Sequence, residues 1–234
     1  MSKEKKEYPK HIGIILDGNR RWAKNKGLKP WDGHKKGAEK WRDLKRWMLD
    51  LDIKELTLYV FSMQNFERDK KEVYFLMKVF ENTFAEILKD PEIDSEEVRI
   101  KHVGKRDLLT NNLKKVIDAL DKKTKKYKKH IVNFCMAYGG QEEIIEAMKK
   151  IYLDKKVKIK DLTAEKFNKY LDVTSNPDII IRTSGEVRTS NFLCWQQAYS
   201  EWFFPTILWP DFTKADLVQI IDEYLGKRER RYGK

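Results

Sequence analysis

The stretch His11-Ile-Gly-Ile-Ile-Leu-Asp-Gly-Asn-Arg-Arg-Trp-Ala23 joins a short apolar run to a cluster of polar and charged residues. Residues 12–16 predict a buried β-strand, and Asp17 begins a polar segment that leads into a helix. In open parallel sheets, functional residues gather beyond the carboxyl ends of the strands. We therefore expect this junction to lie at one edge of a sheet, beside a candidate site.

Apolar runs of the same kind recur at residues 56–61, 98–103, 131–137 and 179–181. Longer segments between them show helical periodicity, for example the steps of three and four through Trp41, Leu44, Met48 and Leu51. A last helix is expected from Thr213 to about Gly226. This alternation predicts an α/β fold with a mostly parallel central sheet surrounded by helices.

Composition limits the organisation and the partners of the chain. At 234 residues and 41% hydrophobic content, residues 1–234 are expected to form a single domain. Residues 1–10 are expected to be flexible, and residues 227–234 to form a basic tail. The net charge of +12 favours an anionic partner, which leaves open nucleic acid, a phosphorylated small molecule or an acidic membrane surface.

We expect the protein to be cytoplasmic, and peripheral contact with a membrane is compatible with its sequence. No apolar run approaches the roughly 20 residues that span a bilayer, and the first ten residues have no apolar core of a signal peptide. Cys135 and Cys194 lack metal-ligand spacing and are expected to be buried free thiols, as suits a reducing compartment.

Residues 73–88 form a helical pattern with more than one apolar face. Tyr74, Phe75 and Val79 add apolar surface beside the main stripe. A helix buried on two sides, a subunit contact and the wall of a hydrophobic tunnel all explain such a pattern.

The polar cluster from Asp17 to Arg21 is suited to binding a phosphate group. A helix start favours an anion, arginine adds a bidentate contact, and Asp17 could hold Mg²⁺ against diphosphate oxygens. The alternative is that Asp17 and Asn19 only cap the helix while the arginines remain solvated.

Further polar clusters follow other expected strands. Arg182 and Arg188, with Ser190, suit a second diphosphate, because two forked cations can neutralise and orient a multiply charged anion. Residues 62–68 offer a hydroxyl, an amide and an arginine, which alone is a weak signal. Glu201 lies in an aromatic run, where a carboxylate needs either a metal or a salt-bridge partner. The sequence leaves three roles for His34: a general base, a phosphate ligand or a residue that only begins a helix.

Together these segments resemble the signatures of undecaprenyl diphosphate synthases and related cis-prenyltransferases. Residues 11–23 resemble the first, Leu56-Thr-Leu-Tyr-Val-Phe-Ser-Met-Gln-Asn-Phe-Glu-Arg68 the second, and Ala137-Tyr-Gly-Gly140 the third. Residues 178–192, continued by Trp209-Pro-Asp-Phe212, resemble the last. The segments follow the family's order and cover almost the whole chain.

The resemblance implies a Mg²⁺-dependent prenyltransferase. Such an enzyme condenses isopentenyl diphosphate stepwise onto an allylic primer, here farnesyl or geranylgeranyl diphosphate. The product would be a long undecaprenyl-like polycis-polyprenyl diphosphate for glycosyl carrier lipids. The resemblance also implies a homodimer, a hydrophobic tunnel for the growing chain and peripheral membrane contact when the product leaves.

The resemblance also implies roles for individual residues. Asp17 bridges Mg²⁺ and, with Asn65 and Ser62, belongs to the catalytic set, while Glu201 assists the metal across the dimer. The isopentenyl diphosphate clamp is Arg182, Arg188 and Ser190. The remaining substrate-binding residues are Gly18, Asn19, Arg20, Arg21, Trp22, Lys29, His34, Phe66, Arg68 and, completing the neighbouring subunit's site, Arg231 and Gly233. Lys29 stands in the loop where bacterial relatives commonly carry an arginine.

Two other functions agree with parts of the sequence. The net charge, basic helices and 12% aromatic content would suit a nucleic-acid-binding protein, but Trp41, Phe80 and Phe84 fall on apolar helix faces, so we expect no nucleic acid partner. A non-catalytic subunit of a heteromeric prenyltransferase would lack the Asp-Gly-Asn-Arg cluster, which this chain retains at residues 17–20. We therefore expect a catalytic chain.

Overall fold

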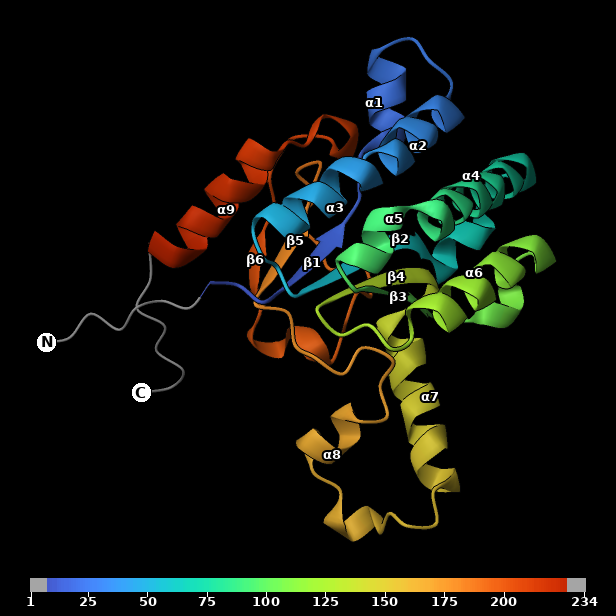
Figure 1. Ribbon diagram of the computed structural model, residues 1–234, viewed down its shortest axis with the longest axis vertical. Helices are drawn as coiled ribbons and strands as arrows, with labels where there is room; N and C mark the ends of the chain where they lie inside the picture. Colours follow the sequence, from blue (N-terminus) through green and yellow to red (C-terminus); the bar gives the residue numbers. More distant parts are fainter. Residues whose placement is uncertain (1–7, 227–234) are drawn as a thin grey trace, which may run out of the picture.

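The computed structural model describes residues 8–226, which form one six-stranded sheet with helices around it (Figure 1). The strand order is β3-β4-β2-β1-β5-β6, and every neighbouring pair is parallel. The strands are β1 (His11–Ile15), β2 (Glu55–Ser62), β3 (Val98–Val103), β4 (His130–Tyr138), β5 (Ile179–Arg182) and β6 (Glu201–Phe203). The expected α/β fold with a mostly parallel sheet is confirmed.

The central strands are apolar along their whole length because both faces of the sheet are covered. Ile12 and Ile14 of β1 belong to the main core, whereas Ile15 points into a smaller core on the opposite face. The main core is closed by α3, α4, α6 and α9, and the smaller one by the chain around Val173 and Phe192. The helices are α1 (Asn19–Asn25), α2 (Pro30–Glu39), α3 (Trp41–Asp50), α4 (Lys70–Lys89), α5 (Pro91–Ser95), α6 (Asn111–Thr124), α7 (Gly140–Leu153), α8 (Ala164–Asn168) and α9 (Lys214–Gly226).

The molecule is elongated, with α1 and α2 at one end and the α7 and α8 pair projecting from the other (Figure 1). A separate small core of Ala147, Ile151, Phe167 and Leu171 joins α7 to α8. Within residues 8–226, no helix is long and apolar enough to cross a bilayer.

Five strands and the last helix were predicted from the sequence, and one strand was missed. β6 has only three residues and lies at the sheet edge, inside an aromatic run whose sequence shows no strand pattern. Thr213 precedes α9, and its hydroxyl accepts the N–H of Asp216 at 3.3 Å, as expected for a cap.

The segment with two apolar faces is α4, which buries Leu76, Phe80 and Phe84 against the main core and leaves Tyr74 exposed.

The sequence also makes predictions about the two cysteines and the two ends of the chain, and the structure tests some of them. Cys135 is buried and unpaired, as expected, but Cys194 is only half-buried because it lies in the loop beside α7. The backbone N–H of Lys10 donates to the Asp178 carboxylate at 2.8 Å, so Lys10 is anchored although the sequence predicts flexibility there. The expectations for residues 1–7 and for the basic tail at 227–234 lie outside the described residues.

Candidate active site

The polar clusters that follow β1, β2 and β5 meet around one cleft at the carboxyl edge of the sheet. The cleft has a volume of about 780 Å³. Its lining includes Asp17, Gly18, Asn19, Arg20, Arg21, His34, Ser62, Asn65, Arg68, Arg182, Glu186, Arg188 and Ser190. The expectation that the candidate residues gather at this edge therefore agrees with the structure for most of them.

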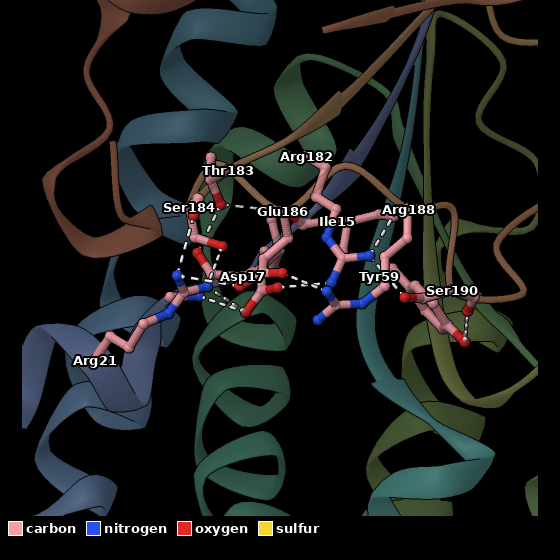
Figure 2. Close-up of polar contacts among 12 residues, drawn as sticks. Ile15, Asp17, Arg21, Tyr59, Arg182, Thr183, Ser184, Glu186, Arg188 and Ser190 are labelled. Carbon is pink, nitrogen blue, oxygen red and sulfur yellow. Dashed lines mark hydrogen bonds and ion pairs between the residues drawn. The ribbon is translucent and has the colours of Figure 1, made fainter. Parts of the chain in front are cut away.

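Asp17 and Arg182 form the ion pair at the centre of the cleft (Figure 2). Strands β1 and β5 are neighbours with Ile15 opposite Arg182, so residues just beyond β1 face the end of β5. Arg182 Nη2 donates to Asp17 Oδ2 at 2.8 Å, and the arginine side chain is only 4% exposed. A guanidinium this buried requires charged and polar partners, and Asp17 supplies the charge.

The other terminal nitrogen of Arg182 holds the loop that carries the second cluster. Nη1 donates to the Ser190 hydroxyl and to the Arg188 carbonyl, both at 2.6 Å. Behind them, the Tyr59 hydroxyl donates to the Ser190 carbonyl at 3.2 Å. Arg182 is thus fixed in place, while Arg188 remains exposed to solvent with its guanidinium paired to Glu186.

Asn191 anchors the same loop to the start of α7. Its carbonyl accepts the N–H of Gly140 at 2.7 Å, and its side-chain oxygen accepts the N–H of Gln141 at 2.9 Å. Ser190 and Asn191 have positive φ angles of 48° and 61°, which L-residues adopt only when their surroundings hold them. The loop is therefore preorganised by contacts outside the cleft.

Arg21 connects the first cluster to the second. Its Nη1 donates to the Ser184 carbonyl at 3.1 Å, and its Nη2 to the Ser184 hydroxyl at 2.5 Å. Glu186 lies between the clusters, 3.3 Å from Arg21 and also paired to Arg188 (Figure 2). In this form, carboxylates neutralise the arginines that face the cleft.

The start of α1 depends on a glycine and on close packing against α2. Gly18 has a φ of 109°, and a Cβ there would lie 2.9 Å from Leu208. A Cβ at Gly37 would lie 2.2 Å from Asn19 Oδ1. No side chain caps this helix start, so the capping role considered for Asp17 and Asn19 is not observed.

Glu72, which the sequence did not single out, is the centre of a third set of contacts. Its side chain is 11% exposed and its Oε1 lies 3.2 Å from Arg68 and 3.9 Å from Arg20. His34 Nε2 lies 3.1 Å from the same oxygen. Burial lowers the pKa of His34 below its ordinary value, and the hydrogen bond to Glu72 opposes that shift only in part. His34 is therefore neutral near pH 7.

Ser62 and Asn65 lie on the rim formed by β2 and η1 (Met63–Glu67). The Asn65 side-chain oxygen accepts the backbone N–H of Ser62 at 3.1 Å, which fixes the turn. Asn65 thereby has a local structural role, and its amide group lies beside the cleft.

Four predicted site residues lie outside the cleft in this chain. Trp22 donates its indole N–H to Asp211 at 2.8 Å, on the side of α1 near η5 (Trp209–Asp211). Lys29 extends over the Trp31 ring, and Phe66 packs edge-on against Phe61. Glu201 lies opposite Ile179 at the other end of β5, in a groove between β6 and α9. Arg231 and Gly233 are outside the described residues.

A narrow apolar cavity of about 70 Å³ adjoins the cleft and runs between α2, α3 and α4. It shares Asn19, His34 and Leu76 with the cleft wall. Deeper in, its lining is apolar and aromatic, with Trp41, Leu44, Phe80, Phe84 and Phe134. Of the three explanations for the apolar α4 helix, burial against the core is observed, and the helix also lines this cavity; the tunnel and the subunit contact stay predictions.

Asp17 is suited to share a metal ion with a bound anion. Among residues 8–226, no group of three or more histidine, cysteine, aspartate or glutamate side chains comes together. A cage built from the protein alone is therefore not formed within the described chain. Mg²⁺ commonly keeps several waters and takes one or two carboxylates plus phosphate oxygens, and a single carboxylate facing an anion-binding cleft fits that pattern.

Comparison with known sequences identifies the relatives of this chain. Residues 15–233 match the family model described as "Putative undecaprenyl diphosphate synthase". The chain is 46% identical to a geranylgeranyl-diphosphate-specific tritrans,polycis-undecaprenyl-diphosphate synthase of Methanocaldococcus jannaschii, covering 99% of this chain and 85% of the relative. It is 43% identical to the enzyme of the same name from Pyrococcus abyssi, covering 97% and 87%.

Comparison with solved structures points to the same family as the comparison of sequences. Lavandulyl diphosphate synthase from Lavandula x intermedia, in complex with dimethylallyl diphosphate, superposes with a TM-score of 0.90 at 33% identity, over 97% of this chain and 99% of that one. A probable undecaprenyl diphosphate synthase from Campylobacter jejuni gives a TM-score of 0.81 at 29% identity, over 98% and 100%. With its sheet, its cleft and these relatives in agreement, this chain belongs to the undecaprenyl diphosphate synthase family of prenyltransferases.

Proposed function

We propose that this chain extends an allylic diphosphate by repeated condensation with isopentenyl diphosphate and makes a long polycis-polyprenyl diphosphate. The observation that carries the proposal is one cleft with two sets of arginines that opens into an apolar cavity. A prenyl chain-elongating enzyme needs two diphosphate sites, so that the two reacting carbons meet, and an apolar space for the lengthening tail.

The two arginine sets have different tasks. Arg182, Arg188 and Ser190 hold the diphosphate of isopentenyl diphosphate, and Arg20, Arg21 and Arg68 hold that of the allylic primer. Both anions take over the charge balance that Glu186 now provides, since Glu186 pairs with Arg188 of the first set and Arg21 of the second. Glu72 stays paired with Arg68 and orients it. The rigid placement of Arg182 reduces the reorganisation needed when substrate binds.

The reaction breaks the allylic C–O bond as the double bond of isopentenyl diphosphate attacks the developing allylic cation. The new carbon–carbon bond leaves a cation on the former isopentenyl unit, and the departing diphosphate accepts one proton from it as the new double bond forms. Arginines around the leaving diphosphate stabilise its charge, and Ser62, Asn65 and neutral His34 orient the substrates and accept hydrogen bonds.

Mg²⁺ is the cofactor that this donor set favours. Asp17 would hold it, and the ion would supply charge stabilisation to the diphosphate that departs. Glu201 of β6 pairs with Ile179, which lies three residues before Arg182 on β5, or roughly 10 Å along that strand. Within one chain Glu201 is therefore remote from Asp17. Its assistance to the metal would require a second subunit.

A homodimer has a suitable surface on α7. Ile145, Met148 and Tyr152 form one exposed stripe on this helix, and Tyr152 is 86% exposed. The groove between β6 and α9 has a volume of about 890 Å³ and offers a second contact surface, at the β6 edge of the sheet. An exposed apolar helix face of this kind is typical of a subunit interface.

The primer that we propose is geranylgeranyl diphosphate, because the relatives named above are specific for it. Contact with a membrane and residence in the cytoplasm stay predictions.

The test is incorporation of labelled isopentenyl diphosphate by purified protein with farnesyl or geranylgeranyl diphosphate, with Mg²⁺ or with excess chelator. We expect incorporation that needs the metal and is faster with geranylgeranyl diphosphate. Incorporation in excess chelator would contradict the metal requirement, and a preference for farnesyl diphosphate would contradict the primer.

A further inference from the structure

A second group of exposed apolar residues lies at the opposite end of the molecule from α7. Leu28 precedes α2, Trp31 is in its first turn, and Tyr74 and Phe75 lie in the early turns of α4. The rings of Trp31 and Phe75 are 6.3 Å apart, so the two helix starts share one surface. Leu28, Trp31 and Tyr74 are 45%, 38% and 64% exposed, and Phe75 is half-buried beneath them. We call these four residues the aromatic patch.

The aromatic patch is surrounded by basic residues. Residues 19–40 contain eight lysines and arginines against two acidic residues; Arg20 and Arg21 line the cleft, which leaves six lysines outside it. Residues 70–78 contain three lysines against one acidic residue. Lys29 lies over the Trp31 ring at 5.3 Å, and Lys26 over the Trp22 ring at 5.1 Å. The acidic residue of the second segment is Glu72, which points inward to Arg68 and His34 and leaves the surface charge positive.

The α7 surface has the opposite character. Residues 140–153 contain three glutamates and two lysines, so the charges around its exposed stripe nearly cancel. An apolar stripe of nearly neutral charge suits a second copy of this chain, which itself is strongly basic. A basic, aromatic surface instead complements an anionic interface, where tryptophan and tyrosine rings lie at headgroup level and lysines meet negative lipids.

The aromatic patch lies beside the route that an amphiphile would take. α2 and α4, whose first turns carry the patch, also line the apolar cavity through Gly37, Ala38, Leu76 and Phe80. Leu76 follows Phe75 directly and lines both the cavity and the cleft. A polyprenyl diphosphate whose head is in the cleft therefore has its tail between the two helices that bear the patch.

We propose that the aromatic patch docks this enzyme on an anionic lipid surface and that the product passes into the membrane between α2 and α4. The proposal rests on the proposed function, because only an amphiphilic product gives this location a use. Docking places the mouth of the cavity at the level of the headgroups, so the apolar tail moves from protein to bilayer with little exposure to water.

Vesicle flotation without substrate tests the docking step. The vesicles are phosphatidylcholine alone or with 30% phosphatidylglycerol, chosen as roughly the charge of an anionic leaflet. We expect binding to the anionic vesicles only, weakened by salt. Lys26→Gln/Lys71→Gln should weaken it by roughly thirtyfold, at about fivefold per lysine near a charged surface. Leu28→Ser/Tyr74→Ser should weaken it by about tenfold.

Matched variants at the other end of the molecule control for charge and hydrophobicity. Lys155→Gln/Lys160→Gln makes the same change in net charge, and Leu153→Ser/Ile159→Ser removes two other exposed apolar side chains. Both should bind vesicles as the wild type does. Prenyl transfer in detergent without vesicles should be unchanged in all four variants, so failure of docking is distinguishable from failure of the proposed function.

Three results would overturn the proposal. One is wild-type protein that does not float with anionic vesicles, or patch variants that bind as well as their controls. Another is a change in oligomeric state of Leu28→Ser/Tyr74→Ser by light scattering, since the patch would then contact a second copy. The third is tighter binding of a duplex oligonucleotide than of vesicles at equal salt, which would assign the basic surface to nucleic acid.

Discussion

Replacing Arg182 by lysine keeps the charge in the clamp but removes the geometry on which the proposed isopentenyl diphosphate site depends. One terminal nitrogen of Arg182 binds the Asp17 carboxylate, and the other binds the Ser190 hydroxyl and the Arg188 carbonyl. A lysine ammonium is a single point and cannot span both sides of this arrangement. The variant therefore separates the effect of the fork from the effect of charge.

The size of the effect follows from the contacts that are lost. If the ammonium stays with Asp17, two hydrogen bonds from a cation to the clamp loop disappear, at about 1.5 kcal/mol or more each. The clamp loop has positive φ angles at Ser190 and Asn191 and relies on such contacts. We expect kcat/KM for isopentenyl diphosphate to fall by about 100-fold, mostly through KM, while KM for the allylic primer changes by less than about threefold.

Steady-state kinetics with each substrate varied in turn measures this split, with circular dichroism to confirm that the variant is folded. Arg188→Lys is the matched control, because Arg188 is 59% exposed and has a single carboxylate partner. It should cost about tenfold or less. Equal losses for both substrates, or an Arg182→Lys enzyme that works as well as the wild type, would refute the assignment of this clamp.

Three further predictions concern other parts of the site. Glu72→Gln keeps the shape of the side chain and removes the charge that holds Arg20, Arg68 and His34. We expect the free energy of unfolding to fall by about 1–2 kcal/mol and the melting temperature by a few degrees. The same variant should raise KM for the allylic primer several-fold and leave KM for isopentenyl diphosphate unchanged, and a reversed pattern in the kinetics would contradict the role of Glu72. Thr83→Phe narrows the apolar cavity that Thr83 lines, so chromatography of the products should show shorter chains, whereas chains of unchanged length would place the tail elsewhere. Burial lowers the pKa of His11, of His34 and of His102, the last to about 4, so below about pH 6.5 the unfolded chain binds protons that the folded one does not. Urea unfolding should show stability falling as pH falls, by up to about 1.4 kcal/mol per pH unit for each histidine. A flat profile between pH 7.5 and 5.5 would show that these three histidines are not held neutral.

Much of the sheet could be predicted because the inner strands are buried on both faces and appear as short apolar runs. The runs that became β1 and β5 also located the site, since their register places Ile15 opposite Arg182 and brings the residues that follow together. β6 could not be predicted in the same way. It has three half-buried residues at the sheet edge, where no apolar run is required.

Contacts between residues far apart in the chain could not be predicted from the sequence. The spacing of residues cannot show that Glu186 lies between Arg21 and Arg188, because that depends on how β1 and the clamp loop meet. It also cannot show the direction of a side chain, which is why Trp22 and Lys29 were expected in the cleft although neither lines it.

Glu72 did leave a signal that could have been followed. It precedes Leu76 by four residues and Phe80 by eight, so it shares the buried stripe of α4. It also follows Arg68 by four residues, a spacing that favours an ion pair. A carboxylate at the end of an apolar stripe, one turn after an arginine, indicates a buried charge that needs partners.

The most direct test of the central claim is the product formed by wild-type protein and by Asp17→Ala from geranylgeranyl diphosphate, labelled isopentenyl diphosphate and Mg²⁺. Chain length is measured by reversed-phase chromatography, and the geometry of the new double bonds by carbon nuclear magnetic resonance. We predict long chains whose added units are all cis from the wild type, and none from the folded variant. Trans units in the product, or no incorporation by folded wild-type protein with either primer, would contradict the account.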